Sequence, residues 1–171
     1  MSVTTTEQDG ITSEEYRDLF RNHPGGVAII TAETEDGPTG FTVTSVNSVS
    51  ASPPVLIFTI NAASRTWKSL QTAESAVVHF LEHSNRELAV KFSTPGINRF
   101  IDTEWSILPT GEPLLSGVHT WARGQVLRRI ASGSSVIVEL LIDTSSTSES
   151  HEPLVYHARS YHRLSENSAI S

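Results

Sequence analysis

Apolar residues recur along the chain in short runs bounded by polar or turn-forming residues, a pattern typical of β-strands. The runs are rich in valine and isoleucine, whose branched side chains pack well on a pleated backbone. We predict strands at residues 27–32, 55–60, 76–81, 118–130, 136–143, 154–157 and 161–164.

Three segments show helical signals instead. Thr12 and Glu15 form a capping-box pattern, which predicts a helix over residues 13–22 that ends before a proline and two glycines. Residues 64–72 and 85–92 each place large apolar side chains three or four positions apart. All three predicted helices are short.

Turn-forming residues separate these elements. Residues 35–38 read as a turn and residues 144–150 as a polar loop, and the prolines and glycines of residues 93–117 predict a long, loop-rich segment. We expect one domain over residues 12–164, with polar tails at 1–11 and 165–171. Many short strands with two or three short helices indicate a mainly β fold, a small barrel or sandwich.

Residues 40–54 carry an unusual density of hydroxyl groups. Six of the eleven residues from 42 to 52 are threonine or serine: Thr42, Thr44, Ser45, Ser48, Ser50 and Ser52. In an extended chain the odd positions form an apolar face, but Ser45 and Asn47 interrupt it. The interruption predicts two extended pieces joined by a bend. Such a segment suits a polar ligand, and it is equally compatible with a solvated strand.

Composition excludes several classes of function. The chain has 171 residues, a formal net charge of −7 and no basic run, which argues against nucleic acid or an anionic membrane as a partner. The absence of cysteine excludes disulfides, thiolate nucleophiles and iron–sulfur clusters. Residues 1–11 lack the pattern of a signal peptide, and the apolar runs are too short to span a membrane, so we expect a cytoplasmic protein.

The histidines do not predict a metal site. His151, His157 and His162 lie near the C-terminus, but on one strand His157 and His162 would face opposite sides. His79 lies inside an apolar run, where a hydrogen-bonded buried histidine is the simpler interpretation.

Taken in order, several motifs resemble those of the flavin reductase-like family. They are Gly25-Gly26 with the strand after it, the hydroxyl-rich segment ending in Pro53-Pro54, the short helix at 64–72, and the C-terminal pair of strands. The resemblance covers about residues 14–164. It implies an FMN-binding split β-barrel and an NAD(P)H:flavin oxidoreductase that supplies reduced FMN or FAD to a separate monooxygenase. It also implies a homodimer, with NADH or NADPH as the hydride donor.

The resemblance also suggests which residues contact the ligands. Thr42, Thr44 and Ser45 would line the edge of the isoalloxazine ring, and Ser48 and Ser50, with nearby backbone amides, would hold the ribityl chain and phosphate. Asn47 is a further candidate for binding the cofactor. Ser64, Arg65 and Thr66 would lie by the phosphate, where a helix N-terminus also favours an anion. Phe92 and Tyr161 are candidates beside the nicotinamide.

One departure from the family pattern leaves alternatives open. Reductases of the family usually carry a Gly-Asp-His triplet between the last two long strands, whereas the equivalent turn here reads Gly133-Ser134-Ser135. Ser135 occupies the place of the family histidine in this turn and is therefore the candidate on the nicotinamide side. A flavin carrier without reductase turnover is the alternative, and a split-barrel oxidase with pyridoxal phosphate is a third possibility.

Overall fold

The computed structural model describes residues 10–147, 149 and 152–170. Its main element is a seven-stranded antiparallel sheet with the order β3-β2-β6-β9-β10-β5-β4. The strands of this sheet, in chain order, are β2 (Ala28–Thr34), β3 (Gly37–Val43), β4 (Asn47–Ala51), β5 (Pro54–Asn61), β6 (Ser75–Phe80), β9 (Thr120–Ser132) and β10 (Ser135–Ser146).

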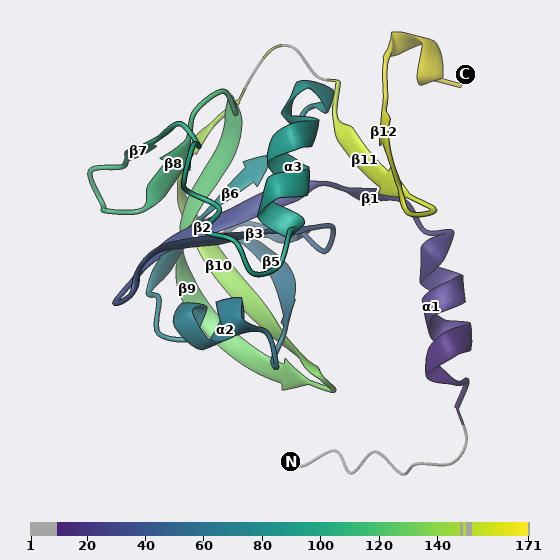
Figure 1. Ribbon diagram of the computed structural model, residues 1–171, viewed down its shortest axis with the longest axis horizontal. Helices are drawn as coiled ribbons and strands as arrows, with labels where there is room; N and C mark the ends of the chain where they lie inside the picture. The colour runs from purple at the N-terminus through teal and green to yellow at the C-terminus, as the bar shows by residue number, and fades with distance from the viewer. Residues whose placement is uncertain (1–9, 148, 150–151, 171) are drawn as a thin grey trace.

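The two outermost strands of this sheet are neighbours in the chain. β3 and β4 lie at opposite ends of the strand order, yet only residues 44–46 connect them. Three residues span about 10 Å when extended, so the sheet must curl until its two edges meet. The result is a barrel that is closed by the chain connection rather than by a strand pair (Figure 1).

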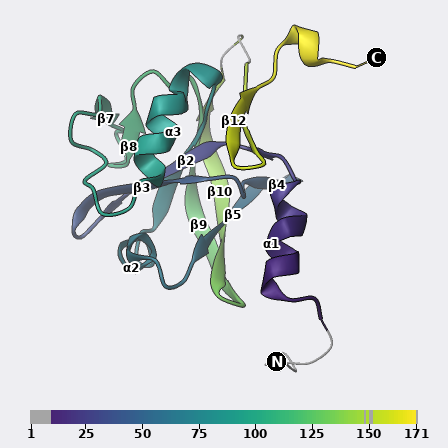
Figure 2. The same cartoon turned by 45° about the vertical axis from the view of Figure 1, so that its right-hand side comes forward.

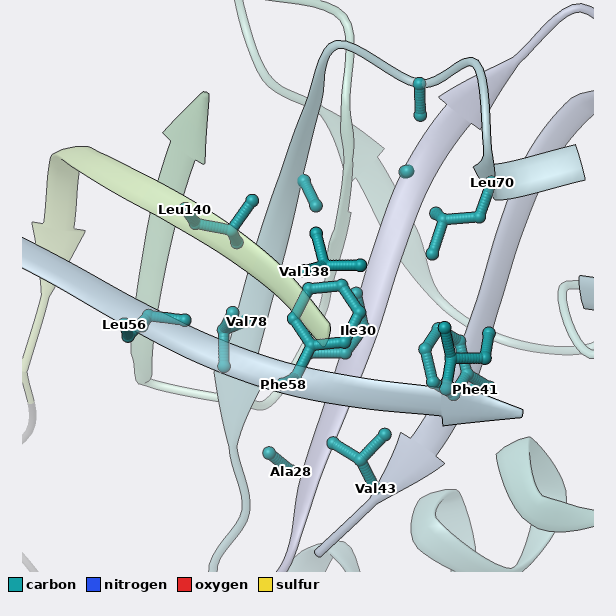
Figure 3. Packing of buried hydrophobic residues seen from close by; sticks show 14 of the residues in the cluster. Ala28, Ile30, Phe41, Val43, Leu56, Phe58, Leu70, Val78, Val138 and Leu140 are labelled. Carbon is teal, nitrogen blue, oxygen red and sulfur yellow. The ribbon is translucent and has the colours of Figure 1, made fainter. Parts of the chain in front are cut away.

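Side chains of alternating strand positions fill the barrel. Leu56, Phe58 and Ile60 point inward from β5, and they meet Ile30 from β2 and Val138 from β10 (Figure 3). Phe58 and Ile30 are fully buried. This interior is the larger of two apolar clusters in the described chain.

Three α-helices lie outside the barrel: α1 (Ser13–Arg21), α2 (Arg65–Leu70) and α3 (Arg86–Ser93). α2 buries Leu70 against the barrel interior, and α3 covers β3 with Ala89 and Phe92. α1 buries no residue and stands beside the rest of the molecule (Figure 2). Two single turns of 3₁₀-helix lie at His83–Asn85 and Glu166–Ser168.

Two small sheets complete the fold. β1 (Gly25–Gly26), β11 (Leu154–His157) and β12 (Ser160–Arg163) form one, and β7 (Trp105–Ile107) with β8 (Pro113–Leu115) forms the other. The second apolar cluster joins them to α3 and the outer face of β2.

Two buried polar groups connect these layers. The His79 ring lies between the carbonyl oxygen of Ile29, 3.2 Å from Nδ1, and the amide nitrogen of Leu115, 3.1 Å from Nε2. Because burial outweighs the hydrogen bond to Ile29, the pKa of His79 falls to about 4. Glu112 is also buried and is paired with Arg123 at 2.7 Å.

The predicted mainly β class with three short helices is confirmed, as are the capping box at Thr12 and the buried, hydrogen-bonded His79. Residues 93–117 were predicted as loop but contain β7 and β8, whose strands of three residues are too short to show alternation. Residues 144–146 extend β10 instead of starting a loop. Within the described ranges, no helix is long and apolar enough to cross a membrane.

Candidate functional site

The barrel is open along one line, between β3 and the second half of β5. β4 pairs with residues 54–57 only, so the edge of residues 58–61 faces β3 without a strand between them. A cavity of about 440 Å³ lies along this opening, and we call it the seam cavity. Its lining includes residues 41–45 of the first edge, residues 59–61 of the second, and Arg99. Its volume lies within the range of sites for small organic ligands.

The predicted bend between two extended pieces lies at this opening. β3 ends at Val43, the chain bends at Thr44, and β4 begins at Asn47. Val49, expected on the apolar face, is 55% exposed because the register shifts between Ser48 and Ser50.

Two of the predicted hydroxyl groups hold the opening together. Ser45 Oγ accepts a hydrogen bond from the Thr59 amide at 3.0 Å and donates to the Thr59 carbonyl at 3.3 Å. Thr42 Oγ1 donates to the carbonyl of Ala89 at 2.6 Å and so attaches β3 to α3. Both residues line the seam cavity, and their hydroxyl groups already have protein partners.

Thr44 is placed differently. It is exposed, and in the described part of the chain its hydroxyl has no hydrogen-bond partner, so it is available to a ligand. Thr44 lines the seam cavity and two neighbouring cavities, one of about 590 Å³ beside α1 and one of about 250 Å³ beside Tyr156 and Tyr161. A ligand longer than the seam cavity could therefore extend past Thr44.

Arg99 brings a positive charge to the seam cavity. Its guanidinium is half-buried and donates to the carbonyls of Gly40 at 2.6 Å and Thr94 at 3.2 Å, and to Thr66 Oγ1 at 3.3 Å. No carboxylate pairs with it among the described residues, and burial lowers the pKa of the guanidinium. A partly desolvated cation without a counter-ion suits an anionic ligand group.

Arg99 was missed from the sequence. It lies in the segment predicted as loop, and its partner Gly40 is 59 residues away, so no local pattern marks it. Of the three residues expected at a phosphate, Ser64 and Thr66 line the seam cavity, whereas Arg65 is exposed and is absent from its lining. The Ser64 hydroxyl accepts from the Trp67 amide at 3.0 Å and so caps α2.

The remaining predicted residues lie around the opening. Asn47 lines the cavity beside α1, and Ser48 and Ser50 lie on β4, outside the lining of all three cavities. Phe92 is fully buried, packs edge-to-face on Phe100, and contributes to the seam lining.

Besides Phe92, two further residues were expected beside a nicotinamide, and they lie at different places. Tyr161 packs on Tyr156 with ring centroids 5.1 Å apart and lines the smallest of the three cavities. Ser135 pairs with Asn61, which lines the seam cavity, and the Ser134 carbonyl accepts from the Ala62 amide at 3.0 Å. The turn therefore lies next to the seam cavity without lining it.

Two of the three C-terminal histidines lie within the described residues, and their rings are close to each other. The rings of His157 and His162 are 5.9 Å apart, and His151 lies outside the described residues. The described residues contain no group of three or more histidine or acidic side chains that could hold a metal ion.

Comparison with known proteins shows which family the chain belongs to. The model of the flavin reductase like domain matches residues 20–165. The NADH:FMN oxidoreductase of Rhodococcus qingshengii is 37% identical over 168 residues, which are 95% of this chain and 88% of the relative.

Solved structures share the whole fold. A flavin reductase domain protein from Arthrobacter sp. FB24 has a TM-score of 0.85 and 32% identity over 90% of this chain and 96% of that chain. Flavin reductase HpaC, solved with NADP⁺, has a TM-score of 0.84 and 25% identity over 91% of this chain and 99% of that chain. With a family match over most of its length and a relative at this level of identity, the chain belongs to the flavin reductase-like domain family.

Proposed function

We propose that the protein is an NAD(P)H:flavin oxidoreductase that binds flavin in the seam cavity and supplies it, reduced, to a separate monooxygenase. The observation that carries this proposal is Arg99, a half-buried cation in a hydroxyl-lined opening that no carboxylate of the described chain pairs with. The Rhodococcus relative, named for NADH and FMN, favours these two as the substrates.

The seam fits the parts of FMN. The flavin phosphate is an anion, and Arg99 with Thr66 offers a guanidinium and a hydroxyl at one end of the cavity. The open edges of β3 and β5 offer main-chain groups to the polar edge of the isoalloxazine ring. Thr44 supplies a hydroxyl that no residue of the described chain engages. These groups could orient the flavin without a metal ion or a nucleophile.

The chemistry is a hydride transfer from the nicotinamide C4 to the flavin N5, which the two small molecules supply themselves. The protein has to orient the two rings and stabilise the negative charge that develops at the N1–O2 edge of the flavin. We assign the second role to Thr44 and to the main-chain amides near it. Positioning and charge stabilisation are then the whole contribution of the chain.

A flavin carrier without reductase turnover remains the second candidate. The turn Gly133-Ser134-Ser135 lies next to the seam cavity and has no imidazole, whereas reductases of the family usually carry one there. A homodimer in the cytoplasm, formed by a domain over residues 12–164, completes the proposal and follows from the family resemblance.

Anaerobic mixing of the protein with FMN and NADH tests the proposal. We expect the visible absorbance of FMN to disappear faster than in a protein-free control. If FMN binds and neither NADH nor NADPH reduces it faster than in the control, the result would support a flavin carrier instead. If FMN does not bind, the seam cavity is not a flavin site.

A further inference from the structure

The largest of the three cavities lies beside α1 and has not yet been given a role. Its volume is about 590 Å³, and we call it the α1 cavity. It is bounded by α1, by the turn between β11 and β12, and by the bend after β3. Figure 2 shows α1 and this turn close together at the same side of the molecule. Thr44, Ser45 and Thr59 line both the α1 cavity and the seam cavity, so the two cavities are neighbours.

The lining of the α1 cavity is positively charged, although the whole chain carries a net charge of −7. Three of the ten arginines of the chain line it, together with two histidines, and none of the acidic residues that the structure describes does. Arg21 is paired with Asp18 at 2.8 Å. Arg17 and Arg159 have no carboxylate partner within the described ranges. A concave site that is lined by positive charges attracts an anion.

The turn that carries Arg159 has an uncommon backbone. Ala158 and Arg159 have φ values of 48° and 64°, a left-handed conformation that residues other than glycine and asparagine rarely adopt. A two-residue hairpin turn requires such angles, and glycine would meet the requirement without a steric cost. The Ala158 amide donates to the Arg21 carbonyl at 3.0 Å, which fixes the turn to the end of α1. An arginine in this strained conformation, where glycine would fit without cost, points to a role for its side chain.

Aromatic rings complete the α1 cavity. The rings of Tyr16 and Phe20 on α1 pack at a tilt with centroids 4.8 Å apart, and Tyr156 of β11 also lines the cavity. Tyr16 and Phe20 are each about half exposed, at 53% and 51%, so their rings are accessible. Aromatic faces bind a flat heterocycle and arginines bind phosphates, and a nucleotide diphosphate combines both groups.

We propose that the α1 cavity binds the adenosine diphosphate half of a dinucleotide whose redox ring lies in the seam cavity. Arg17 and Arg159 contact the phosphates, and Tyr16 and Phe20 contact the adenine. The dinucleotide is FAD or the nicotinamide substrate, because both carry this half. The inference rests on the proposed function for the position of the redox ring, and the charge and shape of the α1 cavity support it independently.

Calorimetric titration with ADP and, separately, with FMN tests the inference without any need for turnover. We expect ADP to bind, and Arg17→Gln and Arg159→Gln each to weaken it by about tenfold or more, since each removes a charge-assisted hydrogen bond. FMN affinity should stay unchanged in both variants. Arg163→Gln is the matched control, because Arg163 is an exposed arginine of the same hairpin that does not line the α1 cavity.

FAD affinity and the KM values for whole and truncated nicotinamide substrates identify which dinucleotide binds in the α1 cavity. If it is FAD, the two variants should bind FAD less tightly than wild type while the KM for NADH stays the same. If it is the nicotinamide substrate, the KM for NADH should rise while that for reduced nicotinamide mononucleotide, a hydride donor that lacks the adenylate, does not.

Three results would overturn the inference: no ADP binding by a protein that binds FMN, an equal loss of FMN and ADP affinity, or a change of oligomeric mass in the variants. The last would mean that a second copy of the chain covers the α1 cavity. ADP binding without FMN binding would instead contradict the proposed function.

Discussion

His79 shows how one buried side chain can make the stability of the fold depend on pH. The Leu115 amide donates to Nε2, so this nitrogen has to carry a lone pair, and Nδ1 carries the proton that is donated to Ile29. A second proton on the ring would turn the Leu115 contact into a clash of two donors. Burial adds to this effect and lowers the pKa of His79 to about 4.

We therefore expect stability to fall as the pH falls from about 6.5 to about 4. In this window the unfolded chain binds a proton on His79 and the folded chain does not, so acid favours unfolding by about 3 kcal/mol in total. Above pH 6.5 the contribution is complete. Urea unfolding at pH 7.5 and 4.5 measures it. His79→Gln, which keeps one donor and one acceptor, should reduce the pH dependence, and an unchanged dependence would exclude His79 as its source.

Arg99 allows a prediction about the flavin phosphate. Arg99→Gln should weaken FMN binding by about tenfold to a hundredfold, because a hydrogen bond to a charged group contributes about 1.5–3 kcal/mol. Fluorescence titration with FMN measures it. Arg65→Gln is the comparison, since the sequence predicts Arg65 at the phosphate and the structure places Arg65 outside the seam lining. A larger loss in Arg65→Gln than in Arg99→Gln would favour the sequence prediction.

Arg99 also has a structural role through the carbonyls of Gly40 and Thr94. Thermal unfolding of Arg99→Gln controls for a loss of folding. Arg99→Lys should recover part of the FMN affinity, because it retains the charge although it loses the forked geometry.

At the scale of elements, local patterns predicted most of the framework. The capping box at Thr12, the apolar strand at residues 55–60 and the bend before β4 all depend on residues close together in the sequence. The shift between Ser48 and Ser50 depends on pairing with β5, and the position of Arg99 depends on Gly40. Contacts between distant segments decide these two features, so the sequence pattern alone does not contain them.

The turn between β9 and β10 provides a prediction at this scale. Ser135→His should lower the KM for NADH and leave FMN affinity unchanged, because it returns an imidazole to the turn next to the seam cavity. Steady-state kinetics with NADH and NADPH measures the effect, and Ser134→His is the matched control one position away. An unchanged KM for both nicotinamides in Ser135→His would show that Ser135 does not occupy the position of the family histidine.

At the scale of the whole molecule, the charges and cavities are distributed unevenly. The chain is acidic overall, yet two neighbouring cavities that share Thr44 are lined by Arg17, Arg99 and Arg159, none of which has a carboxylate partner among the described residues. The family resemblance predicted the barrel and the hydroxyl-rich edge. It did not predict the charged cavity beside α1, which forms only when the C-terminal hairpin returns to the first helix.

Residues 44–46 bring the two edges of the sheet together, so a flavin bound in the seam cavity would also help to hold the barrel closed. A flavin that contacts β3 and β5 together would add to the hydrogen bonds of Ser45 with Thr59 and to the packing of Phe41 on Phe58, and it would restrict the opening of the two sheet edges. Saturating FMN should therefore slow amide hydrogen exchange at residues 41–45 and 58–61 and leave the distant β7–β8 hairpin unaffected. Equal slowing throughout the chain would indicate a global gain in stability instead. The loaded barrel then behaves as a stiffer body than the empty one, and release of the reduced product requires its edges to loosen again.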